Sequence, residues 1–106
     1  MILFHHALVM NQNIRSIKQQ ITPVLKRNNV VRSSLFGSFA RGEATEESDF
    51  DVLVELPRGK SLFDFVGLKL ELEKTLNKKV DLLTYASLSP KLKKIIEREH
   101  IPVYES

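Results

Sequence analysis

Apolar side chains in the first third of the chain recur at the spacing of an α-helix. Between Asn13 and Arg27 they stand three or four positions apart, as they do along one face of a helix. Pro23 interrupts the pattern, which predicts either a kinked helix or a second helix capped by Thr22. The apolar stretch from Met1 to Met10 is broken by two histidines, and we expect a strand or a loose extension there.

Three short apolar runs further along the chain predict β-strands. Val30 to Phe36 is rich in apolar and β-branched residues, Phe50 to Leu56 alternates between apolar and polar positions, and Lys79 to Thr84 is short. Turn residues follow the first two runs directly, and they mark where those strands end. A fourth run, Ile101 to Tyr104, predicts a last edge strand.

Two further segments carry the signals that start helices. Ser61 and Asp64 nearly form a capping box, and the apolar spacing after them predicts a helix to about Asn77. Pro90 predicts the first turn of a final helix, which runs to about Glu99. The apolar residues expected to face the core are Leu62, Phe63, Phe65, Val66, Leu70 and Leu76 in the first helix, Leu92, Ile95 and Ile96 in the second, and Phe36 in the first strand.

The order of these elements predicts the fold class. Helix, strand, strand, helix, strand and helix follow one another with short connections, which favours a two-layer α/β or α+β domain. A chain of 106 residues has the size of one domain, residues 1–106. Residues 1–9 lack the basic start and cleavage site of a signal peptide, and they fit a disposable leader or a flexible extension.

Composition narrows the class of protein. A hydrophobic share of 42% and a charged share of 27% are typical of a soluble globular protein. The chain has no cysteine, which excludes disulfides and thiolate zinc sites and suits a cytoplasmic protein. No run approaches the roughly 20 apolar residues that a membrane span needs, so we expect no membrane association.

Charge is unevenly distributed along the chain. Up to Phe36 there are five basic residues and no acid, whereas Glu43 to Glu55 holds six acids and no base. A basic face can attract nucleic acid or an acidic partner, although such a face more often serves only solubility. No basic stripe is interleaved with aromatic residues, so we expect no direct binding of nucleic acid.

The acidic run contains the first candidate for chemistry. Asp49 and Asp51 are two positions apart at a predicted strand, so their side chains emerge on the same face. Two carboxylates this close repel each other unless a cation neutralises them, although a solvated strand end is the simpler alternative. Hard oxygen ligands of this kind favour magnesium or manganese over zinc.

A third acid supports the metal hypothesis. Asp81 stands inside a short apolar strand, where aspartate is unfavourable, although an exposed edge strand would tolerate it. If that strand lies beside the one that carries Asp51, the three carboxylates converge at one edge of the sheet. Three carboxylates can hold two magnesium ions, an arrangement that catalyses phosphoryl transfer.

A turn that could bind a phosphate precedes the acidic pair. Gly37 follows a strand directly, so the backbone can turn sharply and approach a phosphate closely, while Ser38 offers a hydroxyl at the start of a short helix. Arg41 lies one helical turn later and could bind the same phosphates, or it could pair with Glu46 or Glu47 at the surface. The turn is not a Walker A loop, since no Gly-Lys-Ser/Thr is present.

The string Gly37-Ser38, ten residues, then Asp49-Phe50-Asp51, with Asp81 on a later strand, resembles the DNA polymerase beta nucleotidyltransferase superfamily. The longer sequence from Leu35 to Ala44 is similar to its minimal branch, the MNT domain. The resemblance implies a small mixed sheet with helices packed on one side. It further implies that Gly37 and Ser38 hold the triphosphate of ATP, and that Asp49, Asp51 and Asp81 ligate two Mg²⁺ ions.

MNT proteins of this size resemble antitoxins whose partner is a helical HEPN ribonuclease toxin. The resemblance implies transfer of AMP from ATP to a tyrosine of that toxin, within a hetero-oligomer or a homo-oligomer. Two alternatives stay open, namely an antitoxin that masks its partner without catalysis and a nucleotidyltransferase that acts on a small molecule.

Overall fold

The computed structural model describes the backbone of residues 2–45 and 47–106, and the side chains of residues 14–45 and 47–106. Four strands form one sheet in the order β3-β2-β1-β4. The strands are β1 (Arg32–Phe36), β2 (Phe50–Glu55), β3 (Val80–Thr84) and β4 (Ile101–Glu105). β1 is antiparallel to β2 and β4, and β2 is parallel to β3, so the sheet is mixed, as the resemblance implied. The predicted fourth strand is therefore confirmed as an edge strand beside β1.

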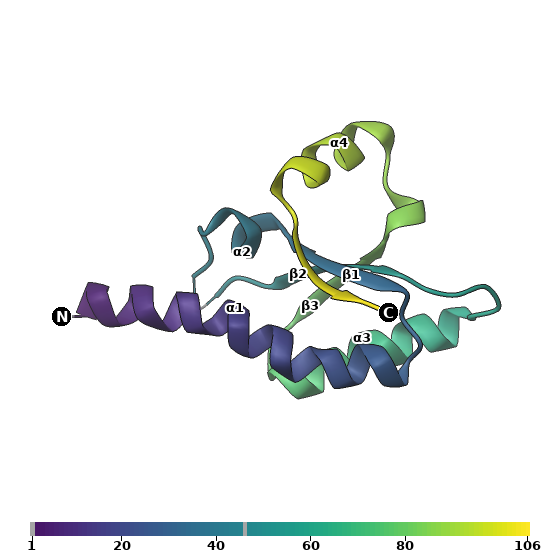
Figure 1. Ribbon diagram of the computed structural model, residues 1–106, viewed down its shortest axis with the longest axis horizontal. Coiled ribbons are helices and arrows are strands. Elements are labelled where there is room, and N and C mark those ends of the chain that lie inside the picture. Colours follow the sequence, from purple (N-terminus) through teal and green to yellow (C-terminus); the bar gives the residue numbers. More distant parts are fainter. Residues whose placement is uncertain (1, 46) are drawn as a thin grey trace.

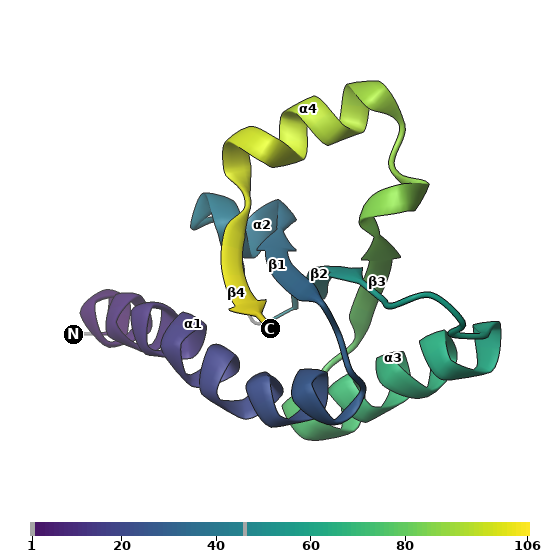
Figure 2. The ribbon, with the colours of Figure 1, turned by 45° about the vertical axis from the view of Figure 1, so that its right-hand side comes forward.

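Two long helices cover one face of this sheet (Figures 1 and 2). They are α1 (Ile2–Arg27) and α3 (Leu62–Leu76), and their apolar residues pack against the sheet. The buried core between them comprises Ile17, Ile21, Val24 and Leu25 of α1, Leu68 and Leu72 of α3, and Leu35, Val52, Val54, Val80 and Leu82 of the strands. The short α2 (Gly37–Arg41), the 3₁₀ turn η1 (Tyr85–Ser87) and α4 (Pro90–Glu99) lie outside this two-helix layer.

α1 is longer than the sequence pattern predicted. It begins at Ile2, where we expected a strand or an extension, and it continues through Pro23 without a second start. The core holds both sides of the proline in place, because Ile21, Val24 and Leu25 are all buried, and this packing offsets the lost backbone hydrogen bond. Asn29 ends the helix with φ of 58°, a left-handed conformation that asparagine tolerates.

The capping box of α3 is confirmed. The Asp64 backbone N–H donates to Ser61 Oγ at 3.2 Å, and the Ser61 backbone N–H donates to Asp64 Oδ2 at 2.8 Å. Replacing Ser61 by alanine is therefore expected to cost about 1 kcal/mol in the free energy of unfolding. Urea denaturation measures this value, and a loss below a few tenths of a kcal/mol would show that the cap contributes little.

The predicted core face of α3 is wrong for four of its six residues. Leu68 and Leu72 are fully buried, whereas Phe63 is 90% exposed and Leu62 76% exposed. Val66 and Leu70 are exposed as well, while Phe65 and Leu76 are partly buried against the core. The helix is apolar on two sides, so its periodicity could not decide which side would meet α1.

The prediction for α4 is correct in its limits and partly wrong in its packing. Pro90 starts the helix, as the sequence indicated, and the structure adds Ser89 as its cap. Ile96 is buried, but Leu92 and Ile95 are exposed. α4 lies on the far side of the sheet from α1 and α3, which leaves less surface to bury it (Figure 2). Among the described helices, none combines the length and apolar character that crossing a membrane requires.

Candidate functional site

The parallel pairing of β2 and β3 brings two of the predicted acids side by side. Asp51 and Asp81 are direct partners in the register of the two strands. Their neighbours Val52 and Leu82 point into the core. Because side chains alternate along a strand, both carboxylates lie on the opposite face, which we call the outer face. Asp49 precedes β2 by one residue and is exposed at the same end of the sheet.

The electrostatics of Asp51 show that both other acids act on it. Burial raises the pKa of the half-buried Asp51 carboxyl above its ordinary value of 3.8, and the charges of Asp81 and Asp49 raise it further. A side-chain hydrogen bond with Asp81 acts in the same direction, because a protonated Asp51 can donate to its neighbour. Arg41 opposes these effects. The site therefore holds an excess of negative charge that a cation would relieve.

Gly37 lies directly against this cluster. Its φ of +69° is in the left-handed region, which favours glycine, and it lets the chain turn from β1 into α2. A Cβ atom placed on Gly37 would overlap the Asp51 carboxylate. The Gly37 turn and Asp51 therefore lie against each other, and their joint role as one site stays a prediction. Ser38 follows at the start of α2 and is partly exposed, and its contact with a phosphate stays a prediction.

Arg41 lies within electrostatic reach of Asp51 but is engaged by other acids. Its guanidinium donates to Glu43 from Nε at 3.1 Å and approaches Glu99 of α4 at 3.5 Å. We expected a surface ion pair of Arg41 with Glu46 or Glu47. The structure pairs Arg41 with Glu43 and Glu99 instead, and Glu46 lies outside the described residues. Both pairs are partly exposed, so they are weak enough for the guanidinium to leave.

The residues fit magnesium by their chemistry, although they are not arranged as a finished ligand cluster. Among the side chains that the structure describes, no three or more His, Asp or Glu residues are placed to hold a metal together. Asp51 and Asp81 are in contact, and the exposed Asp49 acts on Asp51 through its charge alone. The oxygens of the three carboxylates are the hard ligands that Mg²⁺ prefers. A metal ion held by all three carboxylates would then require the side chain of Asp49 to turn toward Asp51 and Asp81.

Magnesium binding is expected to weaken as the pH falls from 7 toward 3.8. A proton on Asp51 competes with the cation, and the raised pKa places this competition above the range of an ordinary aspartate. Well below the folded-state pKa, the affinity should fall by up to about tenfold per pH unit for one displaced proton. Titrating Mg²⁺ by thermal shift at several pH values measures the effect, and a pH-independent midpoint would contradict it.

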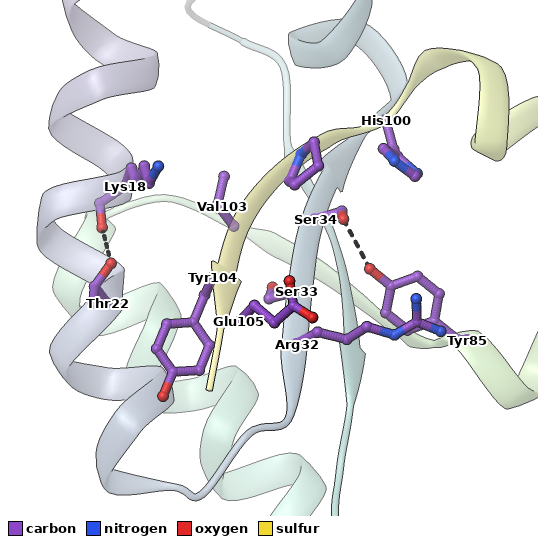
Figure 3. Close-up of a pocket in the computed structure, with 11 residues that line it drawn as sticks. Lys18, Thr22, Arg32, Ser33, Ser34, Tyr85, His100, Val103, Tyr104 and Glu105 are labelled. Carbon is purple, nitrogen blue, oxygen red and sulfur yellow. Dashed lines mark hydrogen bonds between the residues drawn. The ribbon is translucent and has the colours of Figure 1, made fainter.

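Sequence reasoning missed a second polar cluster, formed by β1 and η1 beside β4 (Figure 3). Tyr85 Oη donates to Ser34 Oγ at 2.8 Å, and the Arg32 guanidinium lies 4.1 Å above the Tyr85 ring. These residues help to line a cavity of about 590 Å³ that extends past β4 to Lys18. None of the predicted site residues lines it. Ser33 and Ser34, two polar residues in a buried strand, were the available signal.

Comparison with known proteins agrees with this geometry. Residues 17–103 match the family model of the nucleotidyltransferase domain. A protein of Methanocaldococcus jannaschii, named as a candidate protein adenylyltransferase, is 53% identical over 91 residues, which cover 86% of this chain and 98% of the relative. A solved structure of a candidate minimal nucleotidyltransferase superposes with a TM-score of 0.76 at 40% identity, covering 86% of this chain and 93% of that one.

A more distant structure shares the fold. It holds a tri-AMPylated HEPN toxin of Shewanella oneidensis in complex with an MNT antitoxin. The matched chain has a TM-score of 0.68 at 20% identity, over 87% of this chain and 72% of that one.

Proposed function

The chain belongs to the nucleotidyltransferase domain family, and from that premise we propose that it transfers AMP from ATP to a hydroxyl group of another protein. The observation that carries the proposal is the contact of Asp51 with both Asp81 and the Gly37 turn. That contact joins an acidic cluster to a backbone turn that a phosphate can approach. The name of the Methanocaldococcus relative supports protein as the acceptor.

In this proposal the acids hold Mg²⁺, and the turn holds the phosphates. Asp49, Asp51 and Asp81 would bind the metal, which supplies positive charge to the triphosphate and to the leaving group. Gly37 lets the backbone approach the phosphates, and the Ser38 hydroxyl donates to them. Arg41 leaves Glu43 and Glu99 to add a further positive charge.

The transfer itself exchanges one phosphorus–oxygen bond for another. The acceptor oxygen bonds to the α-phosphorus of ATP, the bond to the β-phosphate breaks, and pyrophosphate leaves. The acceptor hydroxyl gives its proton to a carboxylate, and we assign this role to Asp81. Asp81 is exposed on the edge strand β3 and can face an incoming protein.

We assign the acceptor to a tyrosine of a HEPN toxin, with this chain as the antitoxin. The Shewanella complex of an AMPylated HEPN toxin with an MNT antitoxin supports this assignment, because its antitoxin shares the fold of this chain. We place the acceptor on a separate protein, and the name of the Methanocaldococcus relative, a candidate protein adenylyltransferase, supports this.

Intact-protein mass spectrometry tests the proposal. A HEPN-type partner incubated with this chain, ATP and MgCl₂ should gain the mass of one or more AMP groups, and fragmentation should place them on tyrosine. The Asp49→Asn/Asp51→Asn variant should leave the partner unmodified. If wild type and variant leave the partner equally unmodified while both suppress its ribonuclease activity, the protein acts by masking instead.

A further inference from the structure

α4 leaves part of its apolar side exposed. A helix turns by about 100° per residue, so Leu92, Ile95, Ile96 and Glu99 share one side of α4. Ile96 is buried and Glu99 approaches Arg41 of α2, so this side faces the body of the domain. Leu92 and Ile95 are nevertheless 38% and 46% exposed. The domain itself therefore covers only part of the apolar side of α4.

Basic side chains border the exposed part of this helix side. By the same angular step, Lys91 and Arg98 lie next to Ile95 around the helix, and both are exposed. The helix carries four basic residues against two acids, and one of those acids, Glu99, approaches Arg41. An apolar surface with a positive border is complementary to apolar side chains flanked by carboxylates.

This surface is connected to the acidic cluster. α4 contacts α2, and Glu99 approaches Arg41, whose charge acts on Asp51. A protein bound along α4 would therefore have part of its surface near the carboxylates. AMP transfer requires the acceptor hydroxyl to come close to these same carboxylates.

We propose that Leu92 and Ile95, bordered by Lys91 and Arg98, form the surface on which the acceptor protein docks. The acceptor contributes an amphipathic helix whose apolar side is flanked by carboxylates, since the side chains of two helices interdigitate at such a contact. This inference rests on the proposed function, because it presupposes that the acceptor is a protein.

The exposed apolar side of α3 provides a matched comparison. Leu62, Val66 and Leu70 are at least as exposed as Leu92, and they lie on one side of their helix. α3 begins after the end of β2, whereas Asp51 lies at the start of β2. A partner bound at Leu62 would therefore sit at the far end of the sheet from the acids.

Binding measurements without ATP test the docking surface. The probe is the HEPN-type protein used in the transfer assay, and its affinity is measured by calorimetry. We expect Leu92→Glu/Ile95→Glu to weaken binding at least tenfold. Lys91→Glu/Arg98→Glu should weaken it severalfold and reduce its dependence on salt, whereas Leu62→Glu/Leu70→Glu should stay within twofold of wild type. Magnesium-dependent binding of an ATP analogue should be the same in all four proteins.

The results of these binding measurements test the docking surface separately from the proposed AMP transfer. Full affinity in both α4 variants, a loss confined to the α3 variant, or no complex at all would overturn the docking surface. If Leu92→Glu/Ile95→Glu does not fold, the charge-reversed variant decides the question, since its two side chains are on the surface. A complex that depends on α4 but receives no AMP would support the surface and reject only the transfer.

Discussion

Replacing Asp51 by asparagine is expected to reduce AMP transfer at least about a thousandfold, on the order of 4 kcal/mol of transition-state stabilisation. The amide keeps the shape of the side chain but removes the charge that binds the metal. The same change is expected to raise the stability of the metal-free protein by about 0.5–1 kcal/mol, because Asp51 is half-buried beside Asp81 and Asp49 and its ionised form is disfavoured. Transfer kinetics and urea denaturation in EDTA measure the two effects.

The combination of lost activity and gained stability is the signature of a charged site maintained for function. Glu47→Gln is the matched control, since Glu47 is an exposed acid of the same acidic run. We expect it to change neither quantity. An Asp51→Asn protein that is less stable than wild type would show that the carboxylate has a structural role instead.

Replacing Gly37 by alanine is expected to reduce AMP transfer at least about a hundredfold, roughly 3 kcal/mol. The new Cβ overlaps the Asp51 carboxylate and displaces it from the turn that receives the phosphates. The φ of +69° adds about 1–2 kcal/mol of backbone strain. Steady-state kinetics and thermal unfolding measure the two contributions.

Gly42 offers a control that separates strain from overlap. Its φ of +73° is nearly the same, but a Cβ there meets no atom within 4 Å. Gly42→Ala should therefore lose similar stability and keep its transfer activity within a fewfold of wild type. Equal losses of activity in both variants would show that backbone strain alone, rather than contact with Asp51, explains the effect.

The positions of the candidate site residues relative to one another follow from signals that are local in the sequence. A glycine at a strand end and two aspartates two positions apart fix their own geometry through backbone turns and side-chain alternation. The contact of Asp81 with Asp51 depended on the pairing of β2 and β3, which the motif implied only through the family resemblance. The ion pairs of Arg41 could not be predicted, because Glu99 is brought to it by the position of α4.

The packing of the helices was harder to predict. α3 is apolar on two sides, and only the position of α1 decides that Leu68 and Leu72 are buried and Phe63 is exposed. α4 has a clear apolar side, but Leu92 and Ile95 on that side stay exposed. Hydrophobic spacing indicates that a helix has an apolar side and does not identify what covers it.

Isothermal calorimetry with a non-hydrolysable ATP analogue, with and without MgCl₂, tests the metal site most directly. Wild-type protein should bind the analogue with an affinity that rises at least about tenfold with Mg²⁺, and Asp81→Asn should remove most of that gain. Equal affinity with and without the cation, or an unchanged magnesium effect in Asp81→Asn, would contradict a metal site built from these three carboxylates.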